Sequence, residues 1–252
     1  MSAQKSQIVD AFSKSADSYE QASQVQAQVA AQVAALALDG LVSAPDVLEI
    51  GCGTGGLTRH LLTGTSGGRF VITDIAPNMV DKCKTQCADP RVDYLCMDGE
   101  RPSLEGRQFD LIVSSLAVQW FADLQAGLAE LAGLLKPGGQ LLFSTLGCET
   151  FANWRAAHAA LGLKDGTRSY PDLTEIEALM PSGGSVVLWE ERIERAYDDA
   201  HVFARRLKTI GANTPASGHK PLSPKDFRRI SAHLGENFTD SYHIVYACFI
   251  KS

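Results

Sequence analysis

"VLEIGCGTGGLT", residues 47–58, places a short apolar run directly before a glycine-rich turn. Gly51, Gly53 and Gly56 fit the G-x-G-x-x-G pattern of a turn that joins a parallel strand to a helix and binds a nucleotide-like cofactor. Glycine suits such a turn because it adopts left-handed backbone angles and lets a ligand approach the main chain closely. The turn alone leaves open whether that ligand is a nicotinamide, a flavin or another cofactor.

Short apolar runs, rich in β-branched residues, alternate with helical segments after this turn. Such alternation is typical of a mostly parallel sheet with helices on both faces. The last two runs have the two-residue period of an antiparallel edge pair. We therefore expect an α/β fold with seven strands: "DVLEI" at 46–50, "RFVIT" at 69–73, "RVDYLC" at 91–96, "FDLIVS" at 109–114, "QLLFST" at 140–145, "SVVLWEERI" at 185–193 and "YHIVYACFI" at 242–250.

The chain has 252 residues, of which 45% are hydrophobic, and we expect one domain over 1–252. Val25, Val29 and Val33 recur at helical spacing in an Ala/Gln-rich stretch, which predicts a helix that ends near Gly40. Further along, two helical segments flank a Pro/Gly/Ser-rich loop. The expected parts are an N-terminal helical cap (1–40), a cofactor-binding core (46–145) and a helical substrate-binding or lid insertion before the last strand (198–235).

The formal net charge is −6, so the overall balance favours neither nucleic acid nor an anionic membrane as a partner. No apolar run reaches the length of about eighteen residues that a membrane span needs. The first residues lack the apolar core of a secretory signal, and we expect a cytoplasmic monomer. The six cysteines are scattered; Cys83 and Cys87 form the one close pair and lack the second pair of a structural zinc site. We expect reduced thiols and no metal.

Acidic residues occur where the predicted strands end. In open parallel sheets the ligand lies beyond the carboxyl ends of the strands, so Glu49, Asp74 and Asp98 are expected around one crevice. A dinucleotide-binding enzyme explains Asp74 as a ribose ligand, but a carboxylate beside a pyrophosphate would oppose binding. S-adenosylmethionine has no phosphate and carries a sulfonium and an ammonium group. The acids therefore favour S-adenosylmethionine over a dinucleotide.

Each of these residues has an expected role in binding that cofactor. Glu49 would act near the methionyl ammonium, Asp74 would accept the ribose hydroxyls, and Asp98 would accept the adenine amine. Ile75 and Met79 would flank the adenine ring. The ordinary alternatives are helix caps or solvated turns for the acids and core packing for Met79. The expected cofactor-binding set is Glu49, Gly51, Gly53, Asp74, Ile75, Met79, Asp98, Gly99 and Ser115.

Successive segments of the chain resemble the motifs of the class I, Rossmann-like S-adenosylmethionine-dependent methyltransferases. The matching segments are "VLEIGCGTGGLT", "DIAPNMV", the acid in "CMDGE", "FDLIVSSLAVQW" and "LLKPGGQLLFST". This resemblance implies a seven-stranded sheet whose last strand is antiparallel, with S-adenosylmethionine as the cofactor.

The flanking segments are similar to the malonyl-[acyl-carrier protein] O-methyltransferases of biotin synthesis. They are "AFSKSADSYEQASQVQ", "SSLAVQWFADL", "FSTL", "RRLKTIGANT" and the closing "YHIVYACFI". The resemblance spans nearly the whole chain, although Ser115 stands where that family commonly has Asn. It implies transfer of a methyl group to the free carboxylate of a malonyl thioester, carried by acyl carrier protein or by coenzyme A.

Such a reaction needs few catalytic side chains, since a malonyl carboxylate is already ionised at pH 7 and requires no general base. We expect Tyr19 and Gln119, together with Trp120, to close the pocket, and Lys208 to hold the malonyl carboxylate. The ordinary alternative for Trp120 is core packing. An acidic carrier protein would dock on a run of cations, whose ordinary alternative is a solvated helix face. These cations are Arg205, Arg206, Lys208, Lys220, Lys225, Arg228 and Arg229.

Other functions stay open at this point. The same fold would serve a methyltransferase acting on another small acid, or a C-methyltransferase acting on a quinone precursor, although C-methylation normally requires a base. An NAD-dependent oxidoreductase fits the glycine turn but not Glu49 and Asp98. A non-catalytic module that binds a partner through the basic segment is a third alternative.

Overall fold

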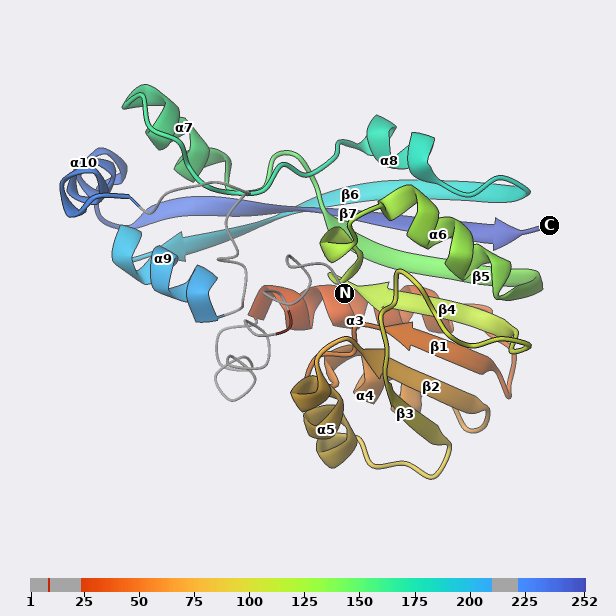
Figure 1. The fold of residues 1–252 in the computed structure, drawn as a ribbon. Coiled ribbons are helices and arrows are strands. Elements are labelled where there is room, and N and C mark those ends of the chain that lie inside the picture. Colours follow the sequence, from red (N-terminus) through yellow and green to blue (C-terminus); the bar gives the residue numbers. More distant parts are fainter. Residues whose placement is uncertain (1–8, 10–23, 210–221) are drawn as a thin grey trace.

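The computed structural model describes residue 9, residues 24–209 and residues 222–252. Its centre is a seven-stranded sheet with the order β3-β2-β1-β4-β5-β7-β6 (Figure 1). Strands β1 to β5 pair in parallel, whereas β7 runs antiparallel to both of its neighbours. The predicted fold class, including the antiparallel last strand, is confirmed. The strands are β1 (Asp46–Ile50), β2 (Arg69–Asp74), β3 (Val92–Cys96), β4 (Phe109–Ser115), β5 (Leu135–Leu146), β6 (Gly184–Tyr197) and β7 (Phe238–Lys251).

Helices cover both faces of the sheet, as neighbouring side chains in β1 illustrate. Val47 packs into a buried cluster with α3 and α4, and Leu48 packs into a second cluster with α6 and α8. The two residues face opposite ways because side chains alternate along a strand. In the described ranges the helices are α3 (Gln24–Leu38), α4 (Gly56–Gly64), α5 (Pro77–Gln86), α6 (Leu124–Gly133), α7 (Ala152–Ala160), α8 (Leu173–Leu179), α9 (Ala200–Thr209), α10 (Pro224–Leu234) and the short 3₁₀ turn η1 (Val118–Trp120).

Helix α3 confirms the prediction made from its valines. Val25, Val29 and Val33 are all buried, and they lie on one face because they are four residues apart. The helix ends at Leu38, and Gly40 adopts the positive φ of a turn that follows a helix.

Strands β6 and β7 are 14 residues long and continue beyond the end of β5. Helices α7, α9 and α10 gather around this protruding ribbon, past the carboxyl ends of the parallel strands (Figure 1). Aromatic side chains pack the junction, with Phe203 5.0 Å from Trp154 and 4.9 Å from Tyr197 between ring centroids. Asp240 of β7 accepts hydrogen bonds from the amides of Asn153 and Trp154 and thereby caps the start of α7.

Two features of the C-terminal half were not predicted individually. Helices α7 and α8 lie between β5 and β6 in the chain. Of the last two strands only β6 is at a sheet edge, since β7 is inserted between β5 and β6. Helices α9 and α10 both lie within the predicted insertion, before β7. A search of the described helices finds none with the length and apolar character that crossing a membrane requires.

Candidate active site

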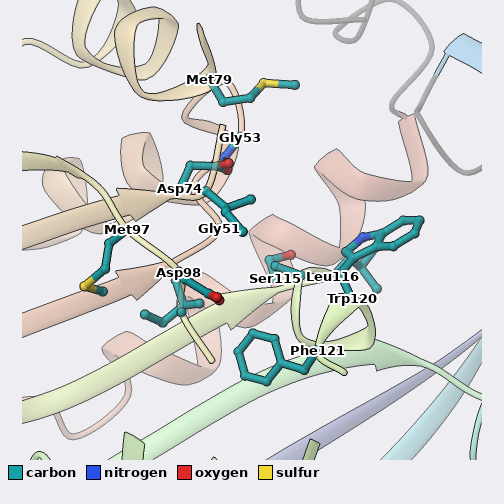
Figure 2. A pocket seen from close by; sticks show the side chains of 14 residues that line it. Gly51, Gly53, Asp74, Met79, Met97, Asp98, Ser115, Leu116, Trp120 and Phe121 are labelled. Carbon is teal, nitrogen blue, oxygen red and sulfur yellow. The ribbon is translucent and has the colours of Figure 1, made fainter. Parts of the chain in front are cut away.

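The carboxyl ends of β1, β2 and β4 and the loop after β3 enclose a cavity of about 710 Å³ (Figure 2). Eight of the nine expected cofactor-binding residues line it, and the ninth, Glu49, lies in an adjoining cavity. The full lining is Ile50, Gly51, Gly53, Asp74, Ile75, Met79, Met97, Asp98, Gly99, Ser115, Leu116, Ala117, Trp120 and Phe121.

The glycine turn is held by main-chain contacts that require glycine. Gly51 has a φ of 74°, and its amide donates to the carbonyl of Thr73 at 2.9 Å. A Cβ at this position would lie 2.3 Å from the Cβ of Ala117, closer than any real contact. Gly53 has a φ of 53° and open space around its missing side chain. The turn thus packs tightly at Gly51 against Ala117, in the segment between β4 and η1, and leaves room at Gly53.

Asp74, the last residue of β2, ties this turn to α5. One carboxylate oxygen accepts from the amide of Gly53 at 2.9 Å, and the other accepts from Ala76 at 2.8 Å. Burial raises the pKa of Asp74, and these two backbone hydrogen bonds oppose that rise. Each oxygen keeps a second lone pair, so the carboxylate can also accept hydroxyl donors from a ligand. Asp74 therefore builds the turn and presents acceptors to the cavity.

Asp98 follows β3 and accepts a hydrogen bond from the Glu100 amide at 3.1 Å. A Cβ on Gly99 would lie 2.3 Å from Cγ2 of Ile50, so glycine lets this loop lie against the end of β1. Met79 is 1% exposed and packs with Ala76 and with Val9 of the N-terminal segment. Two acids and one thioether thus surround the space where the sequence predicts a nucleoside.

Glu49 points away from the main cavity, toward α4. It is 1% exposed, and its carboxyl oxygen accepts a hydrogen bond from Oγ1 of Thr58 at 2.7 Å. Burial raises the pKa of Glu49 to about 8, more than the hydrogen bond from Thr58 lowers it. The adjoining cavity that Glu49 lines, of about 1070 Å³, shares Gly51, Gly53 and Ser115 with the first one. A ligand seated on the turn can therefore reach both cavities.

Of the three expected catalytic residues, the structure describes the side chain of Gln119 alone. Gln119 lies in η1, where its Nε2 donates to the carbonyl of Leu116 at 2.6 Å; it is not among the residues that line the main cavity. Its Oε1 is buried and has no hydrogen-bond partner among the described residues. Lys208 belongs to α9, but its side chain lies outside the described residues, as does Tyr19. Their catalytic roles stay predictions.

Glu100 is a positioning residue that the sequence did not reveal. It is buried, and its two carboxylate oxygens accept from the amides of Ala122 and Asp123, both at 3.0 Å. These bonds hold the segment that directly follows Trp120 and Phe121, two residues that line the cavity. No local pattern could have found them, because the partners lie 22 and 23 positions further along the chain.

The turn after β4 is the second feature that sequence reasoning missed. Leu116 has a φ of 49°, which is rare for a residue with a side chain and is typical of functional sites. Its amide donates to the Ser144 carbonyl of β5 at 3.1 Å, and its side chain lines the cavity. In the part of the chain that the structure describes, no group of His, Cys, Asp or Glu side chains is arranged to hold a metal ion.

Comparison with known proteins identifies the family. Residues 48–143 match the family described as "Methyltransferase domain". Over 240 residues the chain is 40% identical to the malonyl-[acyl-carrier protein] O-methyltransferase of Magnetococcus marinus, with 93% of this chain and 88% of the relative covered. The chain belongs to the malonyl-[acyl-carrier protein] O-methyltransferase family.

A second relative and a solved structure extend the comparison, the solved structure for the fold alone. This family member is 42% identical over 228 residues to the biotin biosynthesis bifunctional protein of Bordetella avium, covering 88% of this chain and 47% of that longer protein. Its fold is similar to that of an N-methyltransferase from Bradyrhizobium japonicum solved with S-adenosyl-L-homocysteine, with a TM-score of 0.52, 16% identity and 88% and 85% of the two chains covered.

The predicted enzyme class and methyl donor are thereby confirmed: the protein is an S-adenosylmethionine-dependent methyltransferase. The cavity fits this cofactor on its own evidence. Asp74 and Asp98 present acceptor oxygens rather than phosphate-binding groups, and a second carboxyl pocket at Glu49 adjoins the glycine turn. A pyrophosphate would meet these acids at close range, whereas a cationic cofactor is attracted to them.

Proposed function

We propose that this enzyme transfers a methyl group from S-adenosylmethionine to the free carboxylate of a malonyl thioester on acyl carrier protein. The product is the malonyl methyl ester that primes pimeloyl synthesis for biotin. The observation that carries the proposal is the 40% identity to a malonyl-[acyl-carrier protein] O-methyltransferase over 93% of this chain. Malonyl-coenzyme A offers the same carboxylate and is the alternative acceptor. The proposal includes a cytoplasmic monomer in which 1–252 form one domain.

The cofactor would lie on the glycine turn. Asp74 would accept the ribose hydroxyls, Asp98 the adenine amine, and Ile75 and Met79 would flank the adenine ring. The backbone at Gly51 and Gly53, the Ser115 side chain and the adjoining Glu49 pocket would receive the methionyl end. Bound S-adenosylmethionine supplies a methyl group on a positively charged sulfur.

The rest of the cavity would serve the acceptor. Leu116, Trp120 and Phe121 supply apolar side chains to the lining, and Trp120 lies on the side away from Asp74 and Asp98 (Figure 2). An ionised carboxylate needs no base, and its attack on a sulfonium neutralises two opposite charges, so exclusion of water by this wall lowers the barrier. Alignment of the reacting groups can contribute about 7 to 11 kcal/mol. We keep Tyr19 and Gln119 as candidates for closing the pocket, and Lys208 for facing the carboxylate.

The carrier protein would dock on the helical insertion. Lys225 and Arg228 of α10 are exposed, and no described residue forms an ion pair with either. Arg206 of α9 donates to Gln24 of α3 at 3.2 Å, which joins the insertion to the N-terminal cap. Acyl carrier proteins are acidic around the prosthetic group, so cations on the insertion would speed association and orient the carrier.

Mass spectrometry tests the function directly. Malonyl-carrier protein incubated with the enzyme and S-adenosylmethionine should gain the mass of one methylene unit, and acetyl-carrier protein should gain none, because it lacks the free carboxylate. Failure to modify the malonyl carrier and malonyl-coenzyme A alike would contradict the proposal. Equal modification of the acetyl carrier would show that the carboxylate is not the nucleophile.

A further inference from the structure

The loop between α7 and α8 reaches the wall of the active-site cavity. Arg168 of this loop is half-buried, and its guanidinium carbon lies 5.2 Å from the centroid of the Trp120 ring. Trp120 itself lines the main cavity beside Phe121. Trp120 therefore contacts both the cavity and the positive charge of Arg168, and Figure 2 shows Trp120 on the side away from Asp74.

Arg155 of α7 holds this loop in place. Its guanidinium donates to Oγ1 of Thr167 at 3.1 Å, to the carbonyl of Arg168 at 3.1 Å and to the carbonyl of Cys148 at 2.5 Å. Asp165 adds a bond from the Thr167 amide at 2.7 Å. Hydrogen bonds to Thr167 and to the Arg168 carbonyl therefore fix the backbone from which the Arg168 side chain extends over Trp120.

The guanidinium N–H groups of Arg168 make no hydrogen bond to another described residue. Other arginines of the chain are paired, as Arg91 is with Asp89 at 2.8 Å and Arg192 with Glu149 at 2.6 Å. Across the described ranges, no carboxylate pairs with Arg168 and no hydrogen bond uses its guanidinium. Contact with an aromatic face leaves the in-plane N–H donors of a guanidinium available, and these match a carboxylate in geometry.

We propose that Arg168 binds the terminal carboxylate of the malonyl acceptor and so selects a malonyl group over an uncharged acyl group. The inference rests on the proposed function, whose acceptor is an anion. Asp74 and Asp98 repel an anion, so the carboxylate approaches along the Trp120 side of the cavity, where the Arg168 guanidinium contacts a lining residue. Holding one carboxylate oxygen on Arg168 leaves the other free to attack the methyl group.

Binding in the presence of S-adenosylhomocysteine, the demethylated product, tests this without turnover. Calorimetry should show that the wild-type enzyme binds malonyl-carrier protein about tenfold or more tighter than acetyl-carrier protein, as expected for a charge-assisted hydrogen-bonded pair. Arg168→Gln should abolish this preference and leave S-adenosylhomocysteine affinity unchanged. Arg168→Lys should retain part of it. Lys164→Gln, which removes an exposed cation from the same loop, should retain all of it.

Steady-state kinetics gives a second readout: the KM of Arg168→Gln for malonyl-carrier protein should rise about 10- to 100-fold. An undiminished malonyl preference in Arg168→Gln, or equal weakening of both carriers, would overturn the role of Arg168. A matching loss of S-adenosylhomocysteine affinity would show that Arg168 only supports Trp120. If the wild-type enzyme methylates malonyl-carrier protein in these outcomes, the proposed function stands and only this inference fails.

Discussion

The two walls of the active-site cavity are built in different ways. The cofactor wall comes from the ends of β1 and β2 and the loop after β3, where each functional residue directly follows or ends a short strand. The acceptor wall is assembled from η1 and the α7–α8 loop, which are distant in sequence and meet where Arg168 covers Trp120. Cofactor binding is therefore a local property of the sequence, and acceptor choice depends on long-range packing.

The walls also differ in charge. Asp74 and Asp98 suit a cationic cofactor, whereas the opposite wall is aromatic and is backed by Arg168, which suits an anionic acceptor. In the proposed reaction, the sulfonium cofactor would be attracted to one wall and the carboxylate acceptor to the other. Substitutions on the two walls should therefore have separable effects.

Asp74→Ala, on the cofactor wall, should have the largest effect of these substitutions, a loss of cofactor affinity. The variant loses the acceptors for Gly53 and Ala76 as well as those facing the cavity, each charge-assisted bond being worth about 1.5 to 3 kcal/mol. We expect S-adenosylhomocysteine affinity to fall about 1,000-fold by calorimetry. Asp74→Asn, which keeps one acceptor oxygen, should lose less. Unchanged affinity in Asp74→Ala would mean that the cofactor lies elsewhere.

Gly51→Ala should destabilise the fold, and Gly53→Ala is its matched control. Both glycines have positive φ, but a methyl group at Gly51 meets Ala117 at 2.3 Å, whereas nothing lies within 4 Å at Gly53. Urea denaturation should show a loss of about 3 kcal/mol for Gly51→Ala and about 1 kcal/mol for Gly53→Ala. Equal losses of unfolding free energy in the two variants would indicate that the turn does not pack against Ala117 after β4.

Glu49→Gln should change how stability depends on pH. The carboxyl of Glu49 has a pKa of about 8 in the folded protein, above its ordinary value of 4.5, so between these pH values the folded state keeps a proton that the unfolded state has lost. This contribution to the free energy of unfolding is complete below pH 4.5 and decreases as pH rises through 8. Glu49→Gln lacks that decrease.

The difference in unfolding free energy between Glu49→Gln and wild type should therefore grow in favour of the variant by about 2 kcal/mol or more from pH 4.5 to pH 8. Urea denaturation across this range measures it, and contributions from all other groups cancel in the difference. Parallel stability curves for the two proteins would show that Glu49 is ionised in the folded state.

The smallest effect is expected for charge reversal on α10. Lys225→Glu combined with Arg228→Glu should slow turnover of malonyl-carrier protein several-fold at low salt, with S-adenosylhomocysteine affinity unchanged. Higher salt should reduce the difference in turnover rate between the variant and wild type, since the screening length is about 8 Å at physiological ionic strength. Arg107→Glu, an exposed cation beside Asp93 on β3, is the control and should have no effect. An equally slow reaction at every salt concentration would exclude docking through α10.

The sequence predicted the sheet and the cofactor wall because the evidence for them is local. Asp74 and Asp98 lie at or just after apolar runs that form parallel strands, so the topology alone brings them into one cavity. The valines of α3 predicted its buried face in the same way.

Trp120 was expected at the pocket and lines it, but the contacts that hold the acceptor wall were not predictable because they join distant segments. Glu100 holds amides 22 and 23 positions away, and Asp240 caps α7 across 86 and 87 positions. In sequence, Arg168 is an ordinary loop cation, and only the packing of α7 against β7 places it over Trp120. The interior position of β7 depends likewise on its pairing with both β5 and β6.

In the proposed reaction, the transferred methyl group is bonded to a carboxylate oxygen of the malonyl group. S-adenosylmethionine labelled with ¹³C in its methyl group, incubated with the enzyme and malonyl-carrier protein, tests this by NMR spectroscopy of the product. We predict a single new resonance with the chemical shift of a methyl ester, which disappears on mild alkaline hydrolysis. A resonance of a methyl group bonded to carbon, stable to alkali, would contradict the account.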